Sequence, residues 1–162
     1  MNDPLSWCHD YPQRTVARGE TLIREGERRD CLYVLRHGSF DVRRDGVCFV
    51  RIAEPGAFLG EISAVLQSEP SATLAAGEES VVHVIEDASA EVRARPELTL
   101  RVAQVLARRL RAVTAYLVDI KRQYAGTDSH LEVMDRVLAE LSMASRLDVE
   151  LGSERADVPD YD

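Results

Sequence analysis

The sequence has no long apolar run. Among its 162 residues, no segment approaches the roughly 18 consecutive apolar residues that a membrane-spanning helix needs. The opening stretch MNDPLSWCHDYPQR carries neither the basic nor the apolar region that begins a secretory signal. We therefore expect a cytoplasmic protein with no membrane partner.

Cysteine is scarce and has no ligand-like spacing. Cys8, Cys31 and Cys48 form no CxxC pair, and no histidine is spaced from a cysteine in a way that suggests a zinc pair. The four histidines are scattered, and neither GxSxG nor HExxH nor a pair of catalytic carboxylates occurs. These absences predict free thiols in a reducing compartment, no metal site and no enzymatic activity.

Acidic residues outnumber basic residues, 28 to 20. The formal net charge is −8, and residues 148–162 hold six acids against one base. Such a balance does not favour non-specific attraction to DNA or to an anionic membrane. Beyond Leu147 there are too few apolar residues to fold alone, so we expect residues 148–162 to be an acidic disordered tail.

Between Arg14 and Ile85, short apolar runs alternate with turn signals. This pattern is typical of a small sandwich or barrel of β-strands. Asp45 and Gly46 predict a tight hairpin turn before the strand VCFVRI, and Gly77 predicts another turn between two later strands. Residues 62–66 are the only helical candidate in this region.

After Asp87 the pattern becomes helical. SAEVRAR predicts a short helix, and Pro96 suits the first turn of a long helix over residues 96–125. That helix carries an apolar seam with spacings of 4, 3, 4 and 3, made of Leu106, Leu110, Val113, Leu117 and Ile120. We expect a homodimer through this seam. Alternatively, a final helix over residues 126–147 folds back and covers it.

Four stretches together resemble one known family: REGE, YVLRHGSFDV, EPGAFLGEIS, and ARRL in the long helix. The family is the cyclic nucleotide-binding domain, as found in catabolite activator (Crp–Fnr-like) proteins, and the similarity covers about residues 14–124. It implies an α+β fold. An N-terminal segment (1–13) would precede an antiparallel, jelly-roll-like β-roll (14–95), followed by the long dimerisation helix and one further short helix.

The resemblance makes residues 58–74 a phosphate-binding cassette, in which backbone amides at a helix start face a cyclic phosphate. Glu61 stands where the family's glutamate bonds the ribose 2′-hydroxyl, although an acid there also suits the helix dipole. The Ser71 hydroxyl faces either the ligand or its own turn. The implied ligand-binding residues are Phe58, Leu59, Gly60, Glu61, Ile62, Ser63, Ser71 and Ala72, with Arg109 and Thr114 as lid contacts from the long helix.

The sequence departs from the family at one position. Pro70 stands where ligand-binding members have the arginine that pairs with the phosphate, and residues 52–92 contain eight acids but no lysine or arginine. Losing that charge-assisted bond should weaken phosphate binding by about one to two orders of magnitude. Arginines outside the cassette either replace it or form a solvated face; the candidates are Arg43, Arg44, Arg51, Arg108, Arg109 and Arg111.

Two functions compete on this evidence. One is a stand-alone sensor that binds a cyclic nucleotide, cyclic AMP first and cyclic GMP second, and signals to an effector protein. The other is a degenerate domain that no longer binds a mononucleotide and serves for dimerisation and docking. A cyclic dinucleotide is a third possibility. The 38 residues after Tyr124 contain one expected helix and an acidic tail, so we predict no nucleic-acid partner.

Overall fold

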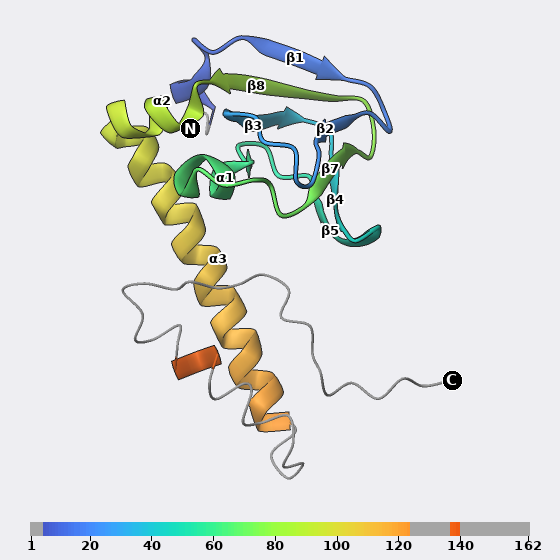
Figure 1. Ribbon diagram of the computed structural model, residues 1–162, viewed down its shortest axis with the longest axis vertical. Helices are drawn as coiled ribbons and strands as arrows, with labels where there is room; N and C mark the ends of the chain where they lie inside the picture. Colours follow the sequence, from blue (N-terminus) through green and yellow to red (C-terminus); the bar gives the residue numbers. More distant parts are fainter. Residues whose placement is uncertain (1–4, 124–136, 140–162) are drawn as a thin grey trace. The chain divides into compact units, whose positions relative to one another are not determined.

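The computed structural model describes residues 5–123 and 137–139. By its contacts the chain divides into two units, Met1–Val105 and Leu106–Asp162. The first unit contains the strands and two short α-helices (Figure 1). The long helix α3 (Pro96–Gln123) begins in the first unit and continues into the second.

Two four-stranded sheets make up the first unit. Within each sheet, every neighbouring pair of strands is antiparallel. The first has the order β1 (Gln13–Val16), β8 (Ser80–Glu86), β3 (Cys31–His37), β6 (Phe58–Leu59), and the second β2 (Thr21–Ile23), β7 (Thr73–Ala76), β4 (Phe40–Arg44), β5 (Val47–Ile52). The predicted α+β fold with an antiparallel β-roll is confirmed.

The hairpin between β4 and β5 forms at the predicted turn. Asp45 and Gly46 have φ values of 51° and 77°, and the strands pair on either side of them, Arg44 opposite Val47. A two-residue turn with positive φ at both positions matches the twist of antiparallel strands, which is why Asp-Gly is favoured there.

An apolar core lies between the two sheets. The largest of its fully buried side chains are Phe40 and Leu35, neither of which has any exposed surface. Burying one such side chain stabilises the fold by about 1.5–3 kcal/mol. The core consists of Val16, Leu22, Ile23, Tyr33, Leu35, Phe40, Val42, Leu59, Leu74, Ala76 and Val82.

Strand β3 is buried on both faces. Tyr33 and Leu35 belong to the core between the sheets, whereas Leu32 and Val34 alternate to the opposite face and are equally inaccessible. Helices α1 (Glu61–Leu66) and α2 (Ala88–Ala94) contact this strand. The run LYVL is therefore apolar at every position, instead of alternating between apolar and polar residues, because helices cover the second face of the strand.

Helices α2 and α3 meet at a sharp break. Arg95 is extended, with φ −116° and ψ 98°, because the ring of Pro96 excludes the helical conformation from the residue before it. The predicted short helix and the predicted start of the long helix at Pro96 are confirmed. No helix among residues 5–123 is long and apolar enough to cross a bilayer.

The remaining predictions for the C-terminal part lie largely outside the described residues. Of the helix expected over 126–147, only residues 137–139 are described, and they are helical. The stop of the long helix at Gly126 and the tail over 148–162 lie outside.

The position of Gly38, between β3 and β4, requires glycine both for its backbone conformation and for its lack of a side chain. Its φ is 97°, and a Cβ atom there would lie 2.7 Å from the Ser80 Cα. The space is closed because the Ser39 amide donates to the Ser80 hydroxyl at 3.0 Å, which draws β8 against this turn. Gly26, Gly56 and Gly60 also have positive φ, as expected for the family's turn glycines.

Gly38→Ala should therefore destabilise the fold more than Gly19→Ala does. Gly19 has a similar φ of 81°, but a Cβ atom there would meet no other atom within 4 Å. Gly19→Ala therefore measures the cost of the backbone conformation alone. We expect a loss of about 1 kcal/mol at Gly19 and at least about 3 kcal/mol at Gly38, measured by urea unfolding. Equal losses at the two sites would contradict the packing argument.

Tyr33 is a core residue with a titratable group. Only 4% of its surface is exposed, and burial, followed by the neighbouring Cys31 thiol, raises the pKa of Tyr33 to about 12. Burial acts this way because it disfavours the charged phenolate. Since an unfolded tyrosine has a pKa of about 10, folding favours the protonated phenol between these two values.

The folded state should therefore lose stability as the pH rises from about 10 through about 12, whereas below pH 10 the contribution of Tyr33 is complete. The unfolding free energy of Tyr33→Phe should fall less over this range than that of the wild type. Tyr116→Phe removes an exposed phenol and is the control. Identical pH profiles for the wild type and Tyr33→Phe would show that the phenol does not contribute.

Candidate functional site

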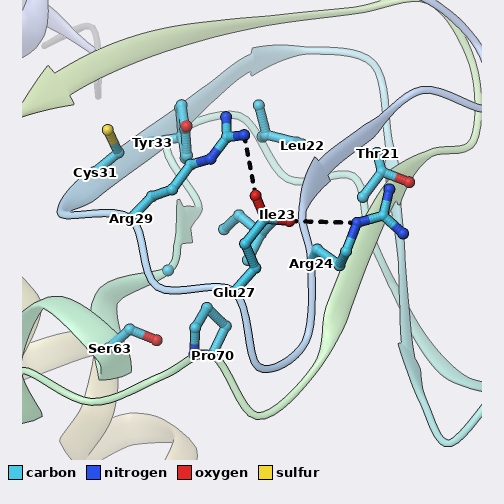
Figure 2. A pocket seen from close by; sticks show the side chains of 11 residues that line it. Thr21, Leu22, Ile23, Arg24, Glu27, Arg29, Cys31, Tyr33, Ser63 and Pro70 are labelled. Atoms are coloured by element: carbon cyan, nitrogen blue, oxygen red, sulfur yellow. Dashed lines mark hydrogen bonds and ion pairs between the residues drawn. The ribbon is translucent and has the colours of Figure 1, made fainter.

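A pocket of about 80 Å³ opens where the cassette meets the loop between β2 and β3. Figure 2 shows its lining side chains. They come from β2, from the β2–β3 loop (residues 24–30), from the first part of β3, and from the cassette. The lining residues are Thr21, Leu22, Ile23, Arg24, Glu27, Arg29, Cys31, Tyr33, Gly60, Ser63 and Pro70.

Gly60 allows the cassette helix to start close to the sheets. It precedes α1 with φ 88°, and a Cβ atom there would lie 3.0 Å from Ile23 Cδ1 and 3.3 Å from the Cys31 carbonyl oxygen. A side chain at this position would push α1 away from β2 and β3. The next residue, Glu61, is only 4% exposed, and Ser63 on the first turn of α1 lines the pocket.

The far end of the cassette is fixed to the β2–β3 loop by two hydrogen bonds. The Gly26 amide donates to the Pro70 carbonyl at 2.9 Å, and the Glu25 amide donates to the Thr73 hydroxyl at 3.0 Å. Pro70, which stands in the place of the family's arginine, therefore lies directly against this loop and lines the pocket. Glu69 is exposed and is not a lining residue.

The cations of the pocket come from the loop. Arg24 Nε lies 3.4 Å from Glu27 Oε2, and Arg29 Nη2 lies 3.3 Å from Glu27 Oε1. The two guanidinium groups each lie beside a different oxygen of the same carboxylate (Figure 2). Sequence reasoning missed this arginine pair. The available signal was the spacing REGERR, in which arginines flank the glycine and glutamate of a loop that the fold places beside the cassette.

The arginines of β4 and β5 that the sequence analysis considered do not line this pocket. Arg51 instead binds Asp41 through two contacts of 2.6 and 3.3 Å, and Arg43 lies 3.9 Å from the same carboxylate. The hydrogen bond from Arg51 holds the pKa of Asp41 below its usual value. These charges stabilise the second sheet.

Of the ten predicted ligand-binding residues, the pocket brings together only Gly60 and Ser63. Phe58, which is 3% exposed, packs beside Trp7, and Leu59, which is 1% exposed, belongs to the core between the sheets. Ile62 is about half exposed and does not line the pocket. Ser71 and Ala72 are half-buried just before β7 and do not line the pocket.

The two predicted lid residues belong to the second unit. Arg109 and Thr114 lie on α3 beyond Val105, and the Thr114 hydroxyl donates to the Leu110 carbonyl at 2.9 Å. This bond satisfies the hydroxyl within its own helix. Their role as lid contacts stays a prediction.

The β2–β3 loop is also joined to α2. The Ala88 amide donates to the Asp30 carbonyl at 3.1 Å, and the Ser89 amide donates to the Asp30 carboxylate at 2.9 Å. The Ser89 hydroxyl donates to the same carboxylate, and this bond in particular lowers the pKa of Asp30. The loop therefore contacts the cassette and, through Asp30, the start of helix α2.

No group of three His, Cys, Asp or Glu side chains within the described ranges is arranged to hold a metal ion. The pocket instead offers two guanidinium groups paired with one carboxylate, the apolar side chains of β2, and the hydroxyls of Thr21, Tyr33 and Ser63. Such a site suits an organic anion of modest size.

Comparison with solved structures supports the family suggested by the sequence. The N-terminal domain of a transcriptional regulator from Streptomyces coelicolor A3(2) is 27% identical, with a TM-score of 0.52, over 72% of this chain and 86% of that one. The catabolite activator protein of Thermus thermophilus is 25% identical, with a TM-score of 0.56, over 86% of this chain and 80% of that one.

A third structure, cAMP-bound PfPKA-R, shares the fold at 19% identity and a TM-score of 0.51, over 83% of this chain and 38% of that one. A search of curated proteins gives no significant match. The model of the cyclic nucleotide-binding domain matches residues 13–92, which span both sheets, the cassette and most of α2. The β-roll of this chain therefore belongs to the cyclic nucleotide-binding domain family.

Proposed function

We propose that the chain is a regulatory module that binds a cyclic mononucleotide in the cassette pocket and signals to a partner protein through its C-terminal helices. The observation that carries this proposal is that Gly60 and Ser63 of the cassette line one pocket together with two arginines. Cyclic AMP is the first candidate ligand and cyclic GMP the second. The module acts by binding, without catalysis.

The connections around the pocket supply a path for the signal. A ligand that contacts the β2–β3 loop acts on Asp30, which is hydrogen-bonded to Ala88 and Ser89 at the start of α2. Helix α2 leads through the extended Arg95 into α3. A shift of the loop therefore changes the position of α2 and, through the break at Pro96, the direction in which α3 leaves the domain.

A degenerate docking module is the competing function, and one observation favours it. The carboxylate of Glu27 already occupies both pocket arginines. If that ion pair is permanent, the pocket is filled by the protein's own side chain and no mononucleotide binds. A cyclic dinucleotide remains a third ligand class to test.

A thermal-shift screen with cyclic AMP, cyclic GMP and cyclic dinucleotides distinguishes these functions. A ligand present at about 100 times its dissociation constant stabilises the folded state by about 2.7 kcal/mol. We expect stabilisation by cyclic AMP. Glu61→Gln should then weaken binding about tenfold or more, because Glu61 is proposed to accept a hydrogen bond from the ribose hydroxyl.

Glu69→Gln is the control for the charge change, since it removes the same charge from an exposed position of the same cassette, whereas Glu61 is only 4% exposed. Glu69→Gln should leave the affinity unchanged. Absence of any shift at millimolar ligand would favour the docking module. Equal effects of the two substitutions would remove the ribose role from Glu61.

We further propose that the module is a homodimer through the apolar seam of α3. Leu110 and Val113 of the seam are 48% and 52% exposed, although both are apolar. Exposed apolar side chains at heptad spacing favour association of two helices. The proposed contact residues are Leu106, Leu110, Val113, Leu117 and Ile120.

Leu110→Glu combined with Leu117→Glu should convert the dimer into a monomer, because charges would then face each other across the seam. Solution mass by light scattering measures this directly. Ala112→Glu combined with Ala115→Glu adds the same charge at exposed positions of α3 outside the seam, and should leave the dimer intact. A dimer that survives the leucine substitutions would refute the seam as its interface.

A further inference from the structure

The pocket beside the cassette contains more positive than negative charge. Its charged lining residues are Arg24, Arg29 and Glu27. One carboxylate neutralises only one of the two guanidinium groups, so a single positive charge remains. This contrasts with residues 52–92, which contain no basic residue.

The arginine pair, Arg24 and Arg29, lines the same pocket as Pro70, the residue that stands where the family has its arginine. Gly26 lies between the two arginines in the sequence. Its amide donates to the Pro70 carbonyl at 2.9 Å, and this bond holds the loop against the cassette. Gly60, Ser63 and Pro70 line the same pocket as the pair. A ligand resting on the cassette would meet guanidinium groups of the loop.

We propose that Arg24 and Arg29 bind the phosphate of the ligand in place of the cassette arginine, and that Glu27 occupies the pair until the phosphate displaces it. The ligand class is a phosphodiester monoanion, as in a cyclic mononucleotide. This inference rests on the proposed function, because it concerns the same pocket.

The exchange of Glu27 for a phosphate costs little. The side chains of Arg24, Arg29 and Glu27 are 65%, 63% and 48% exposed, and their contacts of 3.4 and 3.3 Å are longer than a charge-assisted hydrogen bond of about 2.7–2.9 Å. An exposed ion pair of this kind changes an equilibrium by at most about fivefold. A good hydrogen bond between an arginine and a phosphate changes it by about ten- to a hundredfold.

The inference is tested by titration calorimetry with cyclic AMP and, in parallel, cyclic GMP. Arg24→Gln combined with Arg29→Gln should weaken binding at least about tenfold and reduce its dependence on salt. Glu27→Gln should tighten binding by up to about fivefold, because the competing carboxylate is gone. A gain in affinity cannot arise from misfolding, so the result for Glu27→Gln can be interpreted even if the double arginine variant does not fold.

Arg28→Gln is the matched control. Arg28 is an exposed arginine of the same loop that does not line the pocket, so its removal takes one arginine charge from the loop without touching the proposed site. The affinity should stay within about twofold of the wild type. Pro70→Arg restores a cation to the cassette and should strengthen binding.

The outcomes separate this inference from the proposed function. If the wild type binds a nucleotide and the double arginine variant binds it equally well, the arginine pair has no role and the proposed function stands. If only Glu27→Gln binds, the arginine pair is the anion site, but the wild-type chain is not a nucleotide sensor. If neither the wild type nor Glu27→Gln binds, both proposals are overturned.

Discussion

The arrangement of the pocket depends on how closely the start of α1 approaches β2 and β3. Gly60 permits this approach because it takes a positive φ at a place where a Cβ atom would press on Ile23 and on the Cys31 carbonyl. Once the cassette lies there, the amides of Glu25 and Gly26 can bond Thr73 and Pro70. These contacts bring a loop rich in arginine to a cassette that has none.

This geometry changes how the substitution of the cassette arginine is understood. At the level of sequence, Pro70 removes a cation, and residues 52–92 offer no replacement. In three dimensions, two arginines from a loop more than 40 residues earlier in the chain line the same pocket as Pro70. Moving the cation to the β2–β3 loop also places ligand contacts on the segment that is hydrogen-bonded to α2 through Asp30. The β2–β3 loop would then both bind the anion and transmit its binding to the helices.

Local patterns in the sequence were enough to predict much of the fold. The Asp45-Gly46 turn and the break at Pro96 follow from backbone preferences of a few neighbouring residues, and both are confirmed. The site was harder to predict from the sequence, because the residues that line it come from segments that are distant in the chain. The sequence does not show that Phe58 and Leu59 are buried in packing, nor that Arg51 is bound by Asp41. Arg24 and Arg29 lie outside the cassette, so the family motif did not point to them.

The central claim is that a carboxylate and a phosphate compete for the same two guanidinium groups. A crystal structure of the chain with cyclic AMP tests it most directly. Our account predicts that guanidinium nitrogens of Arg24 and Arg29 lie about 2.7–2.9 Å from phosphate oxygens, with the Glu27 carboxylate turned away from both. A bound nucleotide whose phosphate contacts neither arginine, while Glu27 stays paired with them, would contradict it.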